Sequence, residues 1–318
     1  MTQQNLFENV TAITPIRWAG RKTKLLKVLI GAYEQLNFKP EIYYEPFFGS
    51  GALFFALKSK HLVNKASISD FLSELEIFYK VVKNPSSLNS FLQNVQSLFC
   101  SYNKKRTYGT KSNYYNEIRS EYNLLLNKSK HLLPDEKIDL SSYFYFLNKT
   151  GFNGLYRKNS EGSYNVPHGR RASSISQNVD LSFKDVQNFE NVSLLLKNTK
   201  IYSGAYQKTF QIATKKDFIY IDPPYVNNFV DYSEKGFNDS DHIELSTNLE
   251  KLRLKGVKFL FSNSNTKKTL EIFKNPNLFA YEVGVTRTFD RNTKNKDGKT
   301  SEILISSFSL NNIGKSLW

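Results

Sequence analysis

The chain of 318 residues contains one cysteine, Cys100, four histidines and no long apolar run. A single cysteine excludes an internal disulfide and a cysteine-based zinc site, and the scattered histidines show no spacing of metal ligands. No apolar run comes close to the length of about 18 residues that a transmembrane helix needs. Residues 1–11 lack the charged segment and apolar run of a signal peptide. We therefore expect a cytoplasmic protein without a metal centre or a membrane span.

Acidic residues are few, with 29 Asp and Glu against 44 Lys and Arg, which gives a formal net charge of +15 and a pI near 9.5. A chain this basic and this rich in aromatic residues indicates a polyanionic partner, most simply nucleic acid. The alternative is that the excess of lysine only keeps a Lys- and Asn-rich protein soluble. The length of 318 residues predicts one large or two modest domains, and the hydrophobic fraction of 40% suffices for a substantial core.

The most informative stretch is the apolar run Phe218–Ile221, which is followed by Asp222, Pro223, Pro224 and Tyr225. The run predicts a buried parallel strand, and the two prolines must end it because they donate no hydrogen bond. Asp222 then lies at the carboxyl end of a core strand, where open α/β sheets bind ligands. The carboxylate and the Pro223 carbonyl can both accept hydrogen bonds from one NH2 group, and the tyrosine can stack on its heterocycle. The alternative is a strand that ends in a turn with a helix-capping aspartate.

A second strand, turn and helix unit begins at Ile42 and contains the sequence Glu-Pro-Phe-Phe-Gly-Ser-Gly over residues 45–51. Gly49 and Gly51 allow a ligand to approach the backbone, and the helix that follows from Ala52 offers free N–H groups. A lone Gly-x-Gly is a weak signal. Asp70 ends the next predicted strand, about 20 residues later, where Rossmann-like folds place a carboxylate on ribose hydroxyls. The alternative for Asp70 is the N-cap of a helix over residues 71–82.

Trp18 and Lys22 flank a glycine turn before an amphipathic helix over residues 25–36, so they offer a stacking face and a donor. The alternative is an ordinary helix start capped by Thr23. Residues 71–147 have helical periodicity and contain Lys104 and Lys105 in a basic segment without acids, which is a candidate contact to phosphate or a solvated charge run.

Residues 147–169 predict a β-hairpin with its turn at residues 159–162. Its polar and basic side chains suit a nucleic-acid groove, although an ordinary edge hairpin fits the same pattern. From residue 192 an α/β pattern resumes, with strands expected over residues 199–203, 258–262, 280–285 and 301–308. Helices are expected over residues 206–213, 242–255 and 267–273, and a basic loop over residues 287–299.

These motifs follow one another in a set order: Trp-Ala-Gly-x-Lys, Glu-Pro-Phe-x-Gly-Ser-Gly, a strand-end acid, Asn-Gly-Leu-x-Arg and Asp-Pro-Pro-Tyr. In this order the chain resembles, over nearly its whole length, the Dam-like, D12-class N6-adenine DNA methyltransferases of the alpha group. The resemblance implies an α/β fold with a Rossmann-like sheet that binds S-adenosylmethionine and an inserted target recognition domain made of helices and a β-hairpin. The catalytic domain would span residues 1–70 and 192–318, and the recognition domain residues 71–191.

The resemblance also implies roles for individual residues. The catalytic group would be Asp222, Pro223, Pro224 and Tyr225. The cofactor would be bound by Trp18, Lys22, Glu45, Phe47, Gly49, Ser50, Gly51, Asp70, Tyr206 and Asp222. DNA would be contacted by Phe152, Asn153, Arg157, Lys158, Asn165 and Pro167, together with Lys104 and Lys105. One departure is Ala205, which stands where relatives often carry an aspartate, so the adenine of the cofactor would depend on backbone groups and on Tyr206.

The activity implied is methyl transfer to N6 of a flipped-out adenine in double-stranded DNA, within a site that contains 5′-GA. The enzyme would act as a monomer, either beside a restriction endonuclease that cuts the same site or without one. Two rival readings are a non-catalytic DNA-binding protein and a methyltransferase for RNA or for protein glutamine. The intact Asp222 motif argues against the first, and Asp in place of the Asn of glutamine-modifying relatives argues against the second.

Overall fold

The computed structural model describes residues 10–20, 22, 24–169, 178–226, 237–286 and 299–318. Its centre is an 8-stranded sheet with the strand order β3-β2-β1-β4-β5-β7-β6-β8. The strands are β1 (Tyr43–Glu45), β2 (Ala66–Asp70), β3 (Thr199–Ser203), β4 (Phe218–Ile221), β5 (Lys258–Ser264), β6 (Phe279–Thr286), β7 (Lys299–Ser306) and β8 (Lys315–Ser316). Strands β3, β2, β1, β4 and β5 run parallel, whereas β7 lies antiparallel between β5 and β6.

Strand β4 is an interior parallel strand, as its apolar sequence predicts. All four of its residues are buried, and it pairs in parallel with β1 on one side and with β5 on the other. Successive side chains of a strand point to opposite faces of the sheet. Accordingly, Phe218 and Tyr220 belong to one hydrophobic core, whereas Ile219 and Ile221 belong to the other. The strand is thus fixed from both faces just before Asp222.

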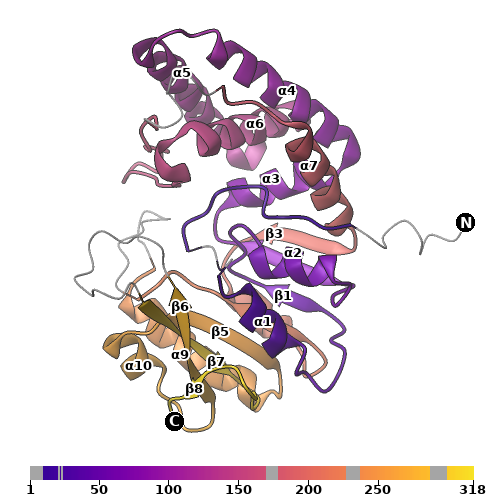
Figure 1. Cartoon of the computed structure of the whole chain (residues 1–318), viewed down its shortest axis with the longest axis vertical. Helices are drawn as coiled ribbons and strands as arrows, with labels where there is room; N and C mark the ends of the chain where they lie inside the picture. Colours follow the sequence, from indigo (N-terminus) through magenta and orange to yellow (C-terminus); the bar gives the residue numbers. More distant parts are fainter. Residues whose placement is uncertain (1–9, 21, 23, 170–177, 227–236, 287–298) are drawn as a thin grey trace, which may run out of the picture.

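Each core is covered by its own helices (Figure 1). The Phe218 side packs with α1 (Leu26–Tyr33), α2 (Ala52–Ser59), α3 (Ser73–Lys83) and α7 (Phe183–Leu195). The Ile219 side packs with α8 (Gln207–Ile212), α9 (Asp239–Leu254) and α10 (Lys267–Phe273). None of the helices that the structure describes is long and apolar enough to cross a membrane.

Three long helices, α4 (Pro85–Asn103), α5 (Tyr108–Asn127) and α6 (Pro134–Thr150), gather at one end of the molecule, with the short turn η2 (Ser129–His131) between α5 and α6 (Figure 1). Local capping fixes where α4 and α5 begin. The side chain of Asn84, the residue before Pro85, accepts a hydrogen bond from the Ser86 amide. Thr107 forms a capping box with Thr110. Helix α3 packs against β3 as well as against α4 and α6, so it joins this group to the sheet.

The predicted hairpin differs from two regular strands. A single-turn helix, η3 (Phe152–Gly154), comes first, and the rest of the segment has isolated bridges between Lys158 and Tyr164 and between Gly151 and His168. The reason is that a side chain of α5 occupies backbone hydrogen-bonding groups that a β-ladder would need. The side-chain amide of Asn123 in α5 accepts from the Tyr164 amide at 2.8 Å and donates to its carbonyl at 3.1 Å. We call residues 151–169 the recognition loop, after the role that the resemblance implies for them.

Candidate active site

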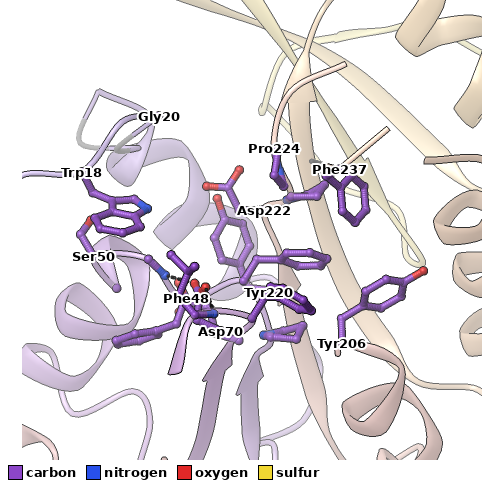
Figure 2. A pocket seen from close by; sticks show the side chains of 18 of the residues that line it. Trp18, Gly20, Phe48, Ser50, Asp70, Tyr206, Tyr220, Asp222, Pro224 and Phe237 are labelled. Atoms are coloured by element: carbon purple, nitrogen blue, oxygen red, sulfur yellow. Dashed lines mark hydrogen bonds between the residues drawn. The ribbon is translucent and has the colours of Figure 1, made fainter. Parts of the chain in front are cut away.

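A cavity of about 420 Å³ lies at the carboxyl ends of β1, β2 and β4 (Figure 2). Every residue that the sequence assigns to the cofactor or to catalysis lines it: Trp18, Lys22, Glu45, Phe47, Gly49, Ser50, Gly51, Asp70, Tyr206, Asp222, Pro223, Pro224 and Tyr225. The carboxyl ends of parallel strands meet at one edge of a sheet, which explains why motifs so distant in sequence converge. Thr23 and most of the basic loop at residues 287–299 lie outside the described residues.

The glycine turn after β1 forms one wall of the cavity. Gly49 and Gly51 have φ angles of +47° and +68°, which disfavour any residue with a Cβ. A Cβ on Gly49 would lie 2.7 Å from the Trp18 indole, and one on Gly51 would collide with the Phe48 ring. The turn therefore presents bare backbone to the cavity at the start of α2.

Asp70 holds this turn from the end of β2. Its Oδ2 accepts a bond from the Gly49 amide at 2.9 Å, and its Oδ1 accepts from the Leu72 amide at 3.1 Å. Burial raises the pKa of Asp70 to about 6, against the opposing effect of these backbone N–H groups. The N-cap of α3 is Leu72, so Asp70 bonds the chain just before the helix rather than capping it.

An aromatic wall closes the side of the cavity toward α8 and α9. The Phe47 ring lies 5.3 Å from that of Tyr206 and 5.8 Å from that of Phe237. Phe237, Gln207, Asn238 and Asp241 line this end of the cavity beside Ala205, and the sequence motifs had not indicated them.

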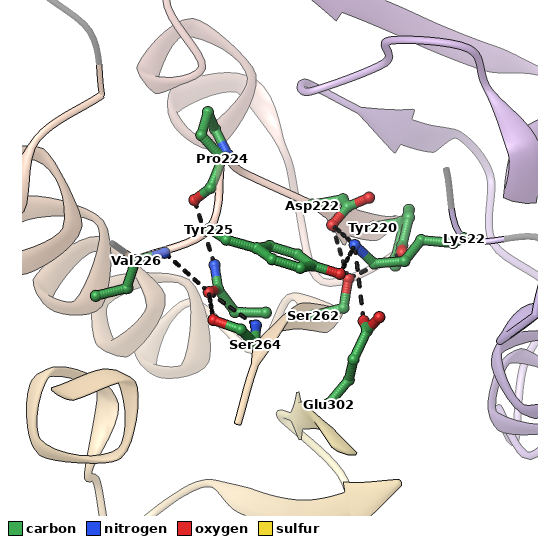
Figure 3. Close-up of polar contacts among 10 residues, drawn as sticks. Lys22, Tyr220, Asp222, Pro224, Tyr225, Val226, Ser262, Ser264 and Glu302 are labelled. Atoms are coloured by element: carbon green, nitrogen blue, oxygen red, sulfur yellow. Dashed lines mark hydrogen bonds and ion pairs between the residues drawn. The ribbon is translucent and has the colours of Figure 1, made fainter. Parts of the chain in front are cut away.

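Lys22 and Asp222 form an ion pair just beyond the end of β4 (Figure 3). The Lys22 Nζ lies 2.5 Å from the Asp222 Oδ1, and the Ser262 hydroxyl donates to the same oxygen at 3.0 Å. The Ser262 hydroxyl in turn shares a 2.9 Å hydrogen bond with the Tyr220 hydroxyl. The second carboxylate oxygen of Asp222 points away from this group in Figure 3, and Asp222 lines the cavity.

Lys22 also joins the two ends of the Asp-Pro-Pro-Tyr motif. Its ammonium donates to the Tyr225 hydroxyl at 3.0 Å and lies 4.4 Å from the centre of the Tyr225 ring. Glu302 of β7 supplies a second carboxylate 3.7 Å from the same ammonium. Asn263 supports the motif from β5, because its amide oxygen accepts from the Val226 amide at 3.2 Å and its nitrogen donates to the Pro224 carbonyl at 3.4 Å.

This site agrees with what comparison with known proteins shows. The family model of D12 class N6 adenine-specific DNA methyltransferases matches residues 18–289, which include Trp18, the glycine turn and the Asp222 motif. The chain belongs to this family. It is therefore an adenine-specific DNA methyltransferase, as the sequence motifs predict.

Curated relatives match over most of their length. Type II methyltransferase M.MjaIII of Methanocaldococcus jannaschii is 35% identical over 259 residues, covering 78% of this chain and 83% of the relative. Type II methyltransferase M1.LlaDCHI of Lactococcus lactis subsp. cremoris is 31% identical over 300 residues, covering 92% and 94%. A DNA adenine methylase of Vibrio cholerae is 26% identical over 295 residues, covering 91% and 94%.

The charges in the methyltransferase site are set by burial and by pairing. Burial raises the pKa of Asp222, and Lys22 and Ser262 oppose that rise. Burial alone would lower the pKa of Lys22, but Asp222, Tyr225 and Glu302 outweigh it and raise the pKa above its usual value. Burial also raises the pKa of Glu45 well above its usual value, although the Tyr43 hydroxyl donates to this carboxyl group at 2.6 Å.

Glu302 is the main residue of the site that sequence reasoning missed. It is buried on β7, opposite Ser264 of β5 and Val283 of β6. A signal existed, because Glu302 is the acid at the start of the apolar run Ile303–Ile305. A charged residue next to a buried strand segment requires a partner, and here Lys22 provides it. In the part of the chain that the structure describes, no group of three or more His, Cys, Asp or Glu could hold a metal ion.

The residues predicted to contact DNA lie mainly in the recognition loop. Phe152, Asn153, Arg157 and Pro167 are exposed, and the Arg157 Nε donates to the Asn165 Oδ1 at 2.7 Å. Lys158 differs from these, since its ammonium lies 2.6 Å from the carboxylate of Glu74.

Lys104 and Lys105 lie in the connection between α4 and α5. Lys104 is exposed, whereas the Lys105 ammonium lies 5.5 Å from the Tyr114 ring centre. Tyr108, at the start of α5, stacks on His168 with ring centres 5.3 Å apart. This stack places the connection that carries Lys104 and Lys105 beside His168, at the end of the recognition loop.

Proposed function

We propose that this methyltransferase transfers the methyl group of S-adenosylmethionine to N6 of an adenine flipped out of double-stranded DNA, within a site that contains 5′-GA. The observation that carries the proposal is the cavity itself. It combines the acceptors Asp222 and Pro223 at the end of β4 with the glycine turn and Asp70. One cavity therefore offers both a base-sized polar pocket and a nucleoside-binding wall.

The residues of the cavity fit S-adenosylmethionine. Gly49 and Gly51 line the cavity with bare backbone, which lets a ligand approach closely, and a Cβ at either position would collide with the Trp18 or the Phe48 ring. Asp70 can accept hydrogen bonds from ribose hydroxyls, and the Phe47, Tyr206 and Phe237 rings offer an apolar wall for a purine. Glu45 ends β1, which lies in the sheet between β2, the strand that ends at Asp70, and β4, the strand that precedes Asp222.

When bound, S-adenosylmethionine supplies an electrophilic sulfonium methyl group. The chain's own task is to orient the adenine N6, whose lone pair is delocalised into the ring. Hydrogen bonds from N6 to the Asp222 Oδ2 and the Pro223 carbonyl favour a pyramidal nitrogen whose lone pair points at the methyl group. A carbon–nitrogen bond forms, the carbon–sulfur bond breaks and one N6 proton leaves. Lys22 and Ser262 hold the other carboxylate oxygen, so Asp222 keeps its orientation.

Base flipping and sequence reading belong to the same proposal. Unstacking an adenine costs a few kcal/mol, and stacking on Tyr225, about 1–3 kcal/mol, would offset part of that cost. The exposed Phe152 would occupy the space beside the remaining base pairs. Arg157 would contact O6 and N7 of the guanine that precedes the adenine, since its guanidinium has the planar fork for this contact.

The relatives support two settings for the activity. Two of them are named Type II methyltransferases, which supports a role beside a restriction endonuclease that cuts the same site. Another is named DNA adenine methylase, which supports action without such a partner. In either setting we propose that the chain acts on DNA as a monomer in the cytoplasm.

The test is labelled-methyl transfer to duplex DNA, RNA and protein, followed by sequencing of the modified bases. We expect methylated adenine in DNA, preceded by guanine. The Asp222→Ala variant should bind DNA but retain less than a tenth of the wild-type rate, which corresponds to about 1.4 kcal/mol. The exposed Asp180→Ala serves as the control for loss of a carboxylate. Transfer to RNA or protein, or a different base before the adenine, would contradict the proposal.

A further inference from the structure

A buried carboxylate, that of Glu74, anchors the recognition loop. Glu74 lies in the first turn of α3 and is 2% exposed. Its Oε1 accepts a short hydrogen bond from the Tyr156 hydroxyl, and the Lys158 ammonium lies 2.6 Å from the same oxygen. A buried carboxylate is costly unless it is paired and hydrogen-bonded, and these two residues of the loop supply both interactions.

The residue between these two anchors is Arg157. In an extended chain, residues 156 and 158 point to one side and residue 157 points to the other. The structure follows this alternation, because Tyr156 is buried, the Lys158 side chain is 16% exposed, and Arg157 is exposed. On the outer side, the Asn165 amide donates to the Arg157 carbonyl at 3.1 Å, and the Arg157 Nε donates to the Asn165 side chain. Asn165 thus holds the Arg157 guanidinium, while the two neighbours in the sequence hold the backbone segment that carries it.

The anchor is connected to the cofactor side of the molecule. The Tyr156 ring stacks on Trp18 with centres 5.6 Å apart and an interplanar angle of 24°. Its hydroxyl also lies 3.2 Å from the Tyr122 hydroxyl of α5. Trp18 lines the cavity, so Tyr156 joins the loop to the cavity wall as well as to α3.

We propose that Lys158 and Tyr156 are positioning residues for sequence reading: by binding Glu74 they hold Arg157 in the orientation that discriminates the base before the target adenine. The inference rests on the proposed function, which assigns guanine reading to Arg157. It changes the role of Lys158 from a DNA contact to the counter-ion of Glu74. A bidentate contact to guanine depends on the direction of the guanidinium plane, so a loosened anchor weakens discrimination.

The experiment measures binding to two duplexes that differ only in the base pair before the target adenine, at several salt concentrations. Lys158→Met should lower the ratio of the two affinities about five- to tenfold, which is part of the discrimination that a bidentate base contact supplies. The salt dependence should not change, because no phosphate contact is lost. Lys158→Arg should preserve the ratio, because it keeps the charge beside Glu74.

A direct phosphate contact by Lys158 gives the opposite pattern. Lys158→Met would then weaken binding to both duplexes equally and reduce the salt slope by about one. That result, or an unchanged affinity ratio, would overturn the inference. If Lys158→Met does not fold, Tyr156→Phe provides the second variant. It keeps the ring on Trp18, removes the hydroxyl from Glu74, and should also lower the ratio.

Two further variants separate this inference from the proposed function. Arg157→Ala must lose discrimination; if it does not, guanine reading by Arg157 and the anchor are both wrong. If Arg157→Ala loses discrimination but Lys158→Met keeps it, the anchor alone is wrong. In the double variant Glu74→Gln with Lys158→Met, no buried charge is left without a partner, so this variant should recover part of the ratio that Lys158→Met loses.

Discussion

Replacing Lys22 by methionine tests the ion pair at the centre of the site. The Lys22 and Asp222 side chains are 3% and 19% exposed, and their charged atoms lie 2.5 Å apart. A hydrogen bond between charged groups at such a site contributes about 1.5–3 kcal/mol. If that interaction orients Asp222 in the transition state, its loss lowers kcat about 10- to 150-fold.

The variant should also change the pH dependence of the rate. Burial raises the pKa of Asp222 and Lys22 opposes the rise, so removing Lys22 should raise the pKa further. In the proposed mechanism Asp222 accepts hydrogen bonds from N6 in its ionised form, so the acidic limb of the kcat profile should move to higher pH and activity should recover as the pH is raised.

Steady-state kinetics with a duplex substrate across a pH series is the assay. Lys22→Arg keeps the charge and should retain the acidic limb of the wild-type kcat profile. Lys267→Met controls for loss of an exposed lysine. The reasoning fails if Lys22→Met raises only the KM for S-adenosylmethionine, with kcat and the acidic limb unchanged. Lys22 would then be the cofactor contact that the sequence motif indicates.

Three further predictions concern the cofactor wall and the basic connection. Asp70→Ala should weaken S-adenosylmethionine binding by roughly 1.5–3 kcal/mol in calorimetric titration. In the wild type, burial raises the pKa of Asp70 from 3.8 to about 6, so the Asp70 carboxylate takes up its proton at a higher pH in the folded protein than in the unfolded chain. As the pH falls through 6 toward 4, Asp70 should therefore add stability, absent in Asp70→Asn, while cofactor affinity falls; a parallel fall of both would contradict this. Gly49→Ala should cost roughly 1–2 kcal/mol from its positive φ and displace Trp18, which a lower melting temperature and altered tryptophan fluorescence would show. Lys104→Ala should weaken binding to all duplexes equally and flatten its salt dependence, whereas an effect confined to one sequence would exclude a phosphate contact.

The part of the cavity formed by Asp222, the glycine turn and Asp70 could be predicted because its sequence signals are local. The run Phe218–Ile221 specifies a buried strand, and the prolines after it fix where Asp222 must lie. The glycine turn and Asp70 each follow a strand in the same way. Once the strands are parallel, all three signals meet at one edge without further information.

The partners of charged residues could not be predicted, because they depend on tertiary pairing. Glu302 reaches Lys22 only because β7 inserts between β5 and β6 and places Glu302 opposite Ser264. The hydroxyl of Tyr156 meets Glu74 across 82 residues of sequence, so Lys158 beside it appears in the sequence as a free surface cation. The predicted turn at residues 159–162 forms between the antiparallel partners Lys158 and Tyr164. The two strands expected around it do not form, since Asn123 of α5 takes the backbone bonds of Tyr164.

The position of β7 has a consequence for protein synthesis. Lys22 and Asp222 leave the ribosome long before Glu302, and β5 gains its second neighbour only when β7 pairs with it. A nascent chain that ends at β6 therefore has the glycine turn and the Asp-Pro-Pro-Tyr motif but lacks the carboxylate beside Lys22. The complete charge arrangement forms only after β7 has been translated. A nascent chain that has not reached β7 thus lacks one of the two carboxylates beside Lys22.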